Sequence, residues 1–366
     1  MDNLTHTLFG ATLARTPLGR AGRGTTAALV LASNAPDIDF VAAAGGGVKY
    51  LEWHRGMTHG PLGVMGLALV VAAIVAIARR LNPRWQHPDD APFAMLVAVA
   101  AVGVLFHVLM DLPTSYGTRF LSPFSWRWFG VDWMPIVDVY LLIVLASGLF
   151  FGRVSDFARR RNAAIVLTVA AGIYGMRAAA HRQALDLAPR LFGPTLPPRC
   201  DPPDAGAAWL DSWPAPVPSP PLPGRRCLVE IAAIPTFISP FDWRIVAQMS
   251  NAYEIHDINV LDSRFRRPDS ETNVFWRQVT RFPNIWTPAV QQAAVTRLGR
   301  VFLGFSRFPA ARTVSDAAGD TTVRFSDVRF AVGPFLTDLQ GRRVQPFTAT
   351  IRLDPQEHAT SETLGR

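Results

Sequence analysis

Four pairs of ionisable residues stand in the N-terminal part of the chain, next to long apolar segments. The pairs are Asp2 with His6, Asp37 with Asp39, His54 with His59, and His107 with Asp111. Ionisable groups in or beside a membrane are costly to bury, so their repeated occurrence here indicates a function. Imidazole and carboxylate together suit Zn²⁺, Mn²⁺ or Fe²⁺. The sequence therefore predicts a divalent-metal site holding one or two ions, with Zn²⁺ preferred.

The apolar segments decide how these pairs are positioned. Residues 60–78 and 91–110 contain no Asp, Glu, Lys or Arg, and each is near the roughly 20 residues that a helix needs to cross a bilayer. Residues 133–152 and 162–180 are weaker segments that we also expect to span. Residues 4–14 and 25–36 are too short and favour a half-buried hairpin. We expect a membrane all-α bundle of about four spans with a short N-terminal hairpin, then a small soluble α+β domain.

Arginines at the ends of these segments set the expected orientation. Ten of them fall in loops on one side of the membrane, which the positive-inside rule assigns to the cytoplasm: Arg15, Arg20, Arg23, Arg79, Arg80, Arg84, Arg153, Arg159, Arg160 and Arg161. Residues 37–60 and 111–134 should then face the periplasm, together with everything after the last span. The prediction is a multi-pass protein of the inner membrane with a periplasmic C-terminal domain.

This topology brings the four pairs to one face of the membrane. Spacing of i, i+4 orients both members of a helical pair to the same side of their helix. The predicted metal ligands are His6, Asp37, Asp39, His54, His59, His107 and Asp111. Arg55 is expected to bind an anionic substrate group, and Asp39 is also a candidate for the chemical step. Asp2, Asp132 and Asp138 are candidates for orienting the ligands from behind.

The chain divides into three predicted parts. Residues 1–185 form the membrane domain, and residues 186–224 are rich in proline, which is typical of a semi-rigid linker. Residues 225–366 form the α+β domain, with strands expected at 227–234, 243–249, 253–261, 322–331 and 347–354, and one helix after Pro288. Cys200 and Cys227 could pair in the periplasm or remain two thiols, and the sequence leaves both open.

The net charge of +8 comes almost wholly from arginine, because Lys49 is the single lysine. These arginines form no stripe interleaved with aromatic residues, so we expect no nucleic-acid partner. The partner that the apolar segments predict is the lipid bilayer.

Four motifs, in this order, resemble a family of bacterial inner-membrane proteins described as metal-dependent hydrolases, which includes LexA-regulated members: MDNLTHTLFGATLA, SNAPDIDF, HRGMTHG and FHVLMDLPTSYGTRFLSPFSWRWFGVDW. The resemblance covers residues 1–180, and the segments SPFDWRIV and DVRF look like the longer members. It implies a multi-span membrane protein with metal-dependent hydrolase activity.

A fainter similarity is to zinc-dependent phospholipase C, where His and Asp residues in a comparable order build a metal cluster. The matching positions are His6, Pro36-Asp37, His59, His107 and Asp111, although the later His/Glu helix segment of that group has no counterpart here. This similarity implies a phosphoester substrate.

These observations predict a periplasm-facing metal-dependent hydrolase acting on a phosphoester or lipid-linked substrate, with a metal-activated water as the nucleophile. Two alternatives stay open from the sequence. One is a metal-ion transporter or sensor, because His and Asp at the ends of spans also describe ion pathways. The other is a non-catalytic membrane protein whose C-terminal domain binds a partner.

Overall fold

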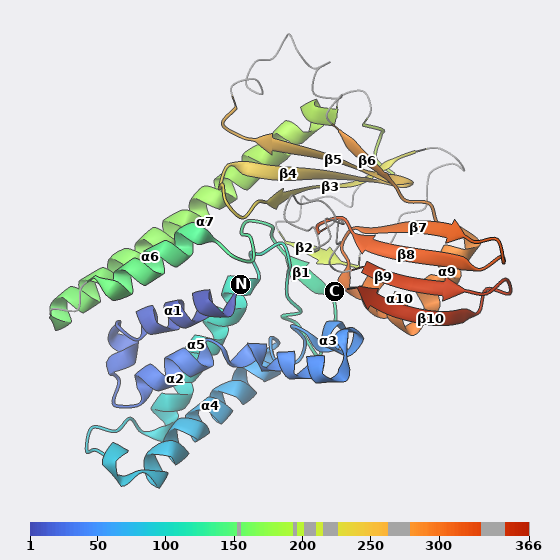
Figure 1. The fold of residues 1–366 in the computed structure, drawn as a ribbon. Coiled ribbons are helices and arrows are strands. Elements are labelled where there is room, and N and C mark those ends of the chain that lie inside the picture. The colour runs from blue at the N-terminus through green and yellow to red at the C-terminus, as the bar shows by residue number, and fades with distance from the viewer. Residues whose placement is uncertain are drawn as a thin grey trace, which may run out of the picture. The chain divides into compact units, whose positions relative to one another are not determined.

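The computed structural model describes residues 1–151, 155–192, 196–200, 210–214, 226–262, 279–330 and 348–365. The chain forms two compact units. The first comprises Met1–Ala42, Trp53–Ala180 and Pro235–Pro240, and the second comprises Ala43–Glu52, His181–Ile234 and Phe241–Arg366. Apolar helices make up the first unit, and antiparallel sheets dominate the second (Figure 1). The predicted fold class, a helical membrane part followed by a small α+β part, is confirmed.

The N-terminal hairpin and the first two spans follow one another along the chain. They are α1 (Asn3–Leu13), η1 (Pro17–Arg20), α2 (Thr25–Ala32), η2 (Ala35–Gly45), α3 (Gly47–Trp53), α4 (Pro61–Leu81), η3 (Pro83–Trp85) and α5 (Phe93–Asp111). Next come β1 (Trp128–Gly130), α6 (Val139–Phe150) and α7 (Asp156–Phe192). Among the described residues, α4, α5 and α7 are each long and apolar enough to cross a membrane. The pair α2 and η2, bent by 43°, could supply a fourth span.

The segment 133–152 was expected to span, and the helix that it forms is shorter than the segment. Its helix α6 covers 12 residues, a length of about 18 Å against a hydrocarbon core of about 30 Å. The helix starts late because the Asp138 carboxylate accepts a hydrogen bond from the Leu141 amide at 2.9 Å and so caps its first turn. Residues 133–137 are apolar too, but the backbone there is not helical.

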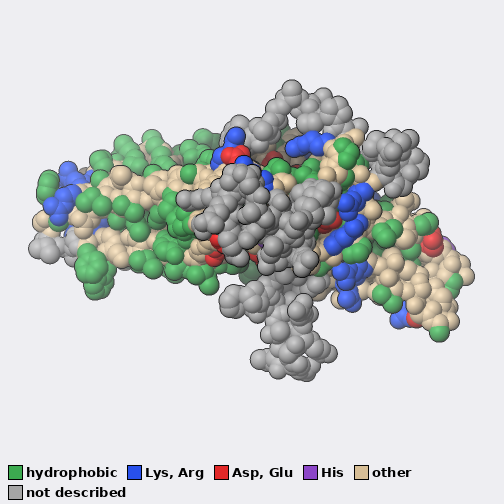
Figure 2. Space-filling view, turned by 90° about the horizontal axis from the view of Figure 1, so that it is seen from above, with side chains coloured by type: hydrophobic (Ala, Val, Ile, Leu, Met, Phe, Trp, Pro, Cys, Tyr) green, Lys and Arg blue, Asp and Glu red, His purple; other side chains and the backbone are tan. Residues whose placement is uncertain are grey.

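Exposed apolar side chains mark the membrane-facing surface of the first unit. On α4, Leu69, Val70, Ile74 and Ile77 are each about half exposed, as expected of residues that face lipid. Figure 2 shows hydrophobic side chains along the flank of α6 and α7, with basic side chains grouped at the end where α7 begins. The exposed arginines of that end are Arg159, Arg160 and Arg161.

Close packing in the first unit depends on small residues. A Cβ added at Gly103 of α5 would lie 2.8 Å from the Ala32 Cβ and 3.2 Å from the Leu29 carbonyl oxygen of α2. A Cβ added at Gly10 of α1 would lie 2.6 Å from the Ser33 hydroxyl, just after α2. Helix α2 is therefore in backbone-to-backbone contact with both α1 and α5, the two helices that carry His6 and His107.

The second unit contains two four-stranded sheets. One has the order β3 (Leu228–Pro235), β4 (Asp242–Met249), β5 (Ala252–Asn259), β6 (Thr280–Pro283), and the other has the order β10 (Ala359–Gly365), β9 (Thr348–Leu353), β8 (Thr321–Asp327), β7 (Pro309–Ser315). The predicted strands correspond to β3, β4, β5, β8 and β9. Strands β6, β7 and β10 were not predicted, because short, polar or charged segments give little alternating apolar signal.

The structure differs from two further expectations for the second unit. The single helix after Pro288 is two helices, α9 (Pro288–Val295) and α10 (Arg297–Phe305), because Thr296 leaves the helical conformation and caps α10 through the Gly299 amide. The proline-rich stretch also has regular structure: α7 continues to Phe192, and β2 spans Asp211–Trp213. Most of the remaining predicted linker lies outside the described residues.

The open question about the two cysteines is answered by a Cys200–Cys227 disulfide, with Cα atoms 4.7 Å apart. The backbone supports it, since Cys200 N–H donates to the Leu228 carbonyl at 2.9 Å. The disulfide therefore joins Cys200 to the residue directly before β3.

Candidate metal centre

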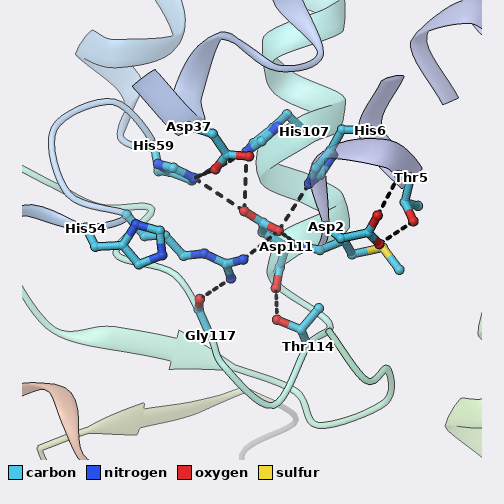
Figure 3. A network of polar contacts seen from close by, with 12 residues as sticks. Asp2, Thr5, His6, Asp37, His54, His59, His107, Asp111, Thr114 and Gly117 are labelled. Carbon is cyan, nitrogen blue, oxygen red and sulfur yellow. Dashed lines mark hydrogen bonds and ion pairs between the residues drawn. The ribbon is translucent and has the colours of Figure 1, made fainter. Parts of the chain in front are cut away.

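Four side chains from three segments converge inside the first unit (Figure 3). Asp37 lies in η2, His59 lies two residues before α4, and His107 and Asp111 lie one turn apart at the end of α5. One ligand atom from each lies within 4.8 Å of all the others. Because α4 starts where α5 ends, the cluster lies at one end of two antiparallel spans.

The separations between these ligand atoms approach those of a tetrahedral site. The two histidine Nε2 atoms are 3.3 Å apart. Asp111 Oδ2 is 3.3 Å from His59 Nε2 and 3.4 Å from His107 Nε2. Asp37 Oδ1 is 3.5 Å from His107 Nε2 and 4.0 Å from His59 Nε2. Tetrahedral ligands about 2.0–2.1 Å from one zinc ion would be about 3.3 Å apart, so four of these five separations are close to the required size.

The hydrogen bonds at Nδ1 of His107 and His59, on the side of each ring away from the cluster, assign the tautomers. His107 Nδ1 lies 2.8 Å from the Ser33 carbonyl oxygen, which only accepts, so Nδ1 carries the proton. His59 Nδ1 lies 3.0 Å from Thr58 Oγ1, and that hydroxyl lies 3.4 Å from Asp39 Oδ2. In both rings the Nε2 lone pair then faces the centre of the cluster, as a metal ligand requires.

Asp111 is fully enclosed, with no exposed side-chain surface. Its Oδ1 is 3.1 Å from Arg55 Nη2, 3.4 Å from His6 Nε2, and in contact with the α-amino group of Met1. Its Oδ2, which faces the two histidines, accepts no hydrogen bond within the part of the chain that is described. A buried carboxylate oxygen without a donor is costly, and a cation bound between Oδ2 and the two Nε2 atoms would remove that cost.

Arg55 joins the cluster to the loop after α5. Its guanidinium donates to the Gly117 carbonyl at 2.7 Å, forms an ion pair with Asp111, and lies 4.8 Å from the centre of the Tyr116 ring. The backbone of Arg55 has φ of 51°, a conformation that is uncommon outside glycine. Its amide donates to Asp39 Oδ2 at 2.6 Å, which holds this turn.

Asp39 and His54 lie beside the four central ligands. Asp39 Oδ1 is 3.1 Å from His54 Nδ1, and Asp39 Oδ2 is 3.7 Å from His59 Nδ1, so this carboxylate faces the back of the His59 ring. Burial holds the pKa of the His54 imidazole below its usual value, while the hydrogen bond to Asp39 acts in the opposite direction. The ligand roles predicted for Asp39 and His54 stay predictions, and the contacts of Asp39 are those of an orienting group.

His6 stacks on His107, with ring centres 3.8 Å apart and an interplanar angle of 22°. It is fully buried, and neither ring nitrogen forms a hydrogen bond with any described residue. Its Nε2 points to the oxygen of Asp111 that the other two histidines do not face. His6 therefore lies at the cluster but outside the tetrahedral group, and its predicted ligand role stays a prediction.

The three residues predicted to orient ligands lie farther out. Asp2 caps α1 by accepting from the Thr5 amide at 3.0 Å and from its hydroxyl at 2.5 Å. Asp138 caps α6 and lies 2.5 Å from the Arg177 guanidinium, both side chains being fully buried. Asp132 is buried in the loop before α6, with φ of 59°. Asp2 and Asp138 have contacts that position helices.

Sequence reasoning missed two supports of the cluster, the Ser33 carbonyl and the Thr58 hydroxyl. A backbone carbonyl gives no signal in a sequence. Thr58, by contrast, directly precedes His59 in HRGMTHG, so its position could have suggested a contact with that ring.

Apolar spans and a buried His/Asp cluster at their end define the class: a multi-pass membrane protein with a group of side chains that could hold a metal ion. The model of the YdjM inner membrane protein family matches residues 1–184, and the chain belongs to this family. The chain is therefore a multi-pass protein of the inner membrane.

The uncharacterized protein YfhP of Bacillus subtilis strain 168 is 28% identical over 151 residues. That alignment covers 39% of this chain and 43% of the relative, so the chain spans less than half the length of this curated relative. No solved structure matches the chain.

Proposed function

We propose that the protein is a membrane-bound metal-dependent hydrolase. The observation that carries the proposal is the set of buried ligand atoms whose mutual distances suit one tetrahedral ion: Asp37 Oδ1, His59 Nε2, His107 Nε2 and Asp111 Oδ2. A mixed nitrogen and oxygen set favours Zn²⁺, with Mn²⁺ or Fe²⁺ as alternatives. A bound ion of this kind supplies Lewis acidity, which activates a water and polarises a phosphoryl or acyl oxygen.

The surrounding residues have separate tasks in this proposal. Asp39 and the Ser33 carbonyl fix the two histidine rings with their Nε2 atoms inward. Arg55 neutralises Asp111 Oδ1 and adds positive charge beside the cluster, where it favours an anionic substrate group. His6, buried and stacked on His107, is the candidate to accept or release a proton during hydrolysis.

The proposed substrate is a lipid or lipid-linked phosphoester. Asp37 is the member of the tetrahedral group with exposed side-chain surface, 15%, while the other three have none. Close to Asp37 in the chain, Ile38, Phe40 and Val41 are 59%, 68% and 69% exposed. Exposed apolar side chains beside the accessible edge of a polar cluster suit a ligand with a charged headgroup and apolar chains. The fainter similarity to zinc-dependent phospholipase C agrees with a phosphoester.

We further propose that the site and the second unit face the periplasm. The basic residues of the loops support this through the positive-inside rule. The Cys200–Cys227 disulfide supports it as well, since disulfides persist in the periplasm and are rare in the cytosol.

Metal transport is the rival that the geometry favours less. A transported ion needs ligands near the middle of the bilayer and a path beyond them. Here Asp111 is the last residue of α5, and His59 lies two residues before α4 begins. Ligands at the ends of spans suit a site that meets its substrate at the membrane surface.

The test is metal content and hydrolysis by the full chain purified in detergent. We expect about one Zn²⁺-class ion per chain by elemental mass spectrometry, its loss in His59→Ala and in Asp111→Asn, and its retention in the control His87→Ala. His87 is exposed, in the α4–α5 connection. The metal-loaded wild type should cleave a phosphodiester lipid analogue, and His59→Ala should not.

Two results would overturn the proposal. A folded wild type that binds no ion after incubation with Zn²⁺, Mn²⁺ or Fe²⁺ would remove the metal site. A metal-loaded protein that cleaves neither phosphodiester nor acyl lipid analogues would remove the hydrolase.

A further inference from the structure

A cavity lies at the other end of α4 and α5 from the metal cluster, around the connection between these two helices. Helix α5 has 19 residues, so the two places are separated by about 27 Å along the helix. The cavity has a volume of 790 Å³, within the usual range of ligand sites, about 300–1,000 Å³.

The lining of this cavity divides into an apolar and a charged part. Ala73, Ala76 and Ile77 of α4 and Phe93 of α5 are apolar, whereas Arg79, Arg80, His87 and Asp90 are ionisable. From Ala73 to Arg80 the lining extends about 10 Å along α4. The apolar side chains of α4 could contact the acyl chains of a lipid, and the cationic side chains at the end of α4 could bind an anionic headgroup.

Among the described residues that line the cavity, Arg80 is a cation available to a ligand. Arg79 donates to the Arg23 and Ala91 carbonyls at 2.9 and 3.1 Å and lies 3.5 Å from Asp90, so its charge is largely used by the protein. Arg80 is exposed, and within the described ranges its guanidinium forms no hydrogen bond or ion pair. His87 is held 3.3 Å from Asp89.

We propose that this cavity binds an anionic phospholipid of the inner membrane, with the phosphate at Arg80 and the first part of an acyl chain against Ala73 and Ile77. A soluble anion would contact only the charged lining residues and would leave the apolar side chains of Ala73 and Ile77 without a ligand contact. A zwitterionic lipid would occupy the wall but would gain less from the arginine. The proposal is independent of the hydrolase reaction, because no residue of the metal cluster lines the cavity.

The test is native mass spectrometry of the full chain in detergent, with phosphatidylglycerol or phosphatidylcholine of identical acyl chains. Wild type should retain phosphatidylglycerol about five-fold more strongly, because one arginine near the surface contributes about 1 kcal/mol. Arg80→Gln should abolish that preference. The control Arg84→Gln, an exposed arginine of the same connection outside the cavity lining, should keep it.

A third variant tests whether the acyl chain contacts α4, and a soluble competitor tests whether the cavity binds anions without acyl chains. Ile77→Trp should fill the wall and weaken retention of both lipids. If soluble glycerol phosphate displaces bound phosphatidylglycerol as effectively as added lipid does, the cavity is a site for soluble anions and the proposal is overturned. An equal effect of Arg80→Gln and Arg84→Gln, or no headgroup preference in wild type, would overturn it too.

Discussion

Asp39 shows how two carboxylates separated by one residue differ in their contacts. Asp37 and Asp39 lie in η2, a 3₁₀ segment with about three residues per turn, so their side chains leave the axis about 120° apart. Asp37 reaches the Nε2 atoms of the cluster, whereas Asp39 reaches His54 and the back of His59. The two carboxylates should therefore contribute to metal binding in different ways.

Substitution of each carboxylate by its amide tests this difference. Asp37→Asn removes an anionic ligand and should abolish stoichiometric binding at micromolar metal. Asp39→Asn keeps the ligand set but weakens the support of His59, and should lower metal affinity about 10–100-fold. Competition against a chromophoric chelator measures both affinities. Wild-type affinity in Asp39→Asn would contradict the orienting role, and loss as complete as in Asp37→Asn would make Asp39 a ligand.

At the scale of elements, contact between α2 and α5 sets the position of His107. Gly103 is one turn before His107, and it faces Ala32 and the Leu29 carbonyl. The next residue after Ala32 is Ser33, whose carbonyl accepts the His107 Nδ1 proton. A side chain at position 103 must therefore either move His107 Nδ1 away from the Ser33 carbonyl or tilt α5.

Alanine at this position should impair the site. The Cβ of Gly103→Ala would lie 2.8 Å from the Ala32 Cβ, closer than side chains tolerate, so we expect a lower Tm and roughly ten-fold weaker metal binding. A Cβ added at Gly66 of α4 would have no atom of another described segment within 4 Å. The control Gly66→Ala should keep metal binding and the Tm, or raise the Tm, because alanine favours a helix over glycine by about 1 kcal/mol. Equal behaviour of the two variants would contradict the packing argument.

The sequence predicted the convergence of Asp37, His59, His107 and Asp111 because the length of an apolar segment fixes where its ends lie. It could not separate ligands from orienting groups, since that depends on angles within η2 and on a backbone carbonyl at Ser33. It overestimated the length of the helix in residues 133–152, because hydropathy does not register a helix cap such as Asp138. The proline-rich composition also led to a linker being predicted from residue 186, whereas α7 continues through Pro189 to Phe192.

At the scale of the whole molecule, α7 belongs to both units. It has 37 residues, a length of about 55 Å, which exceeds a hydrocarbon core of about 30 Å. The first unit includes α7 up to Ala180, and the second includes it from His181. The membrane side reached by the end of α7 therefore decides the compartment of the second unit and of its disulfide.

The disulfide reports that compartment directly. Cells quenched in acid and alkylated under denaturing conditions with a maleimide polymer should show Cys200 and Cys227 protected unless a reductant is added first, because the periplasm is oxidising. In a host without periplasmic thiol oxidation, both cysteines should become reactive. Full alkylation without reductant in a normal host would place the second unit in the cytoplasm, where glutathione keeps thiols reduced, and would reverse the orientation inferred from the arginines. The same reversal would move the metal cluster to the cytoplasmic face, because Asp111 and the start of α4 lie at the opposite end of the spans from Arg79 and Arg80.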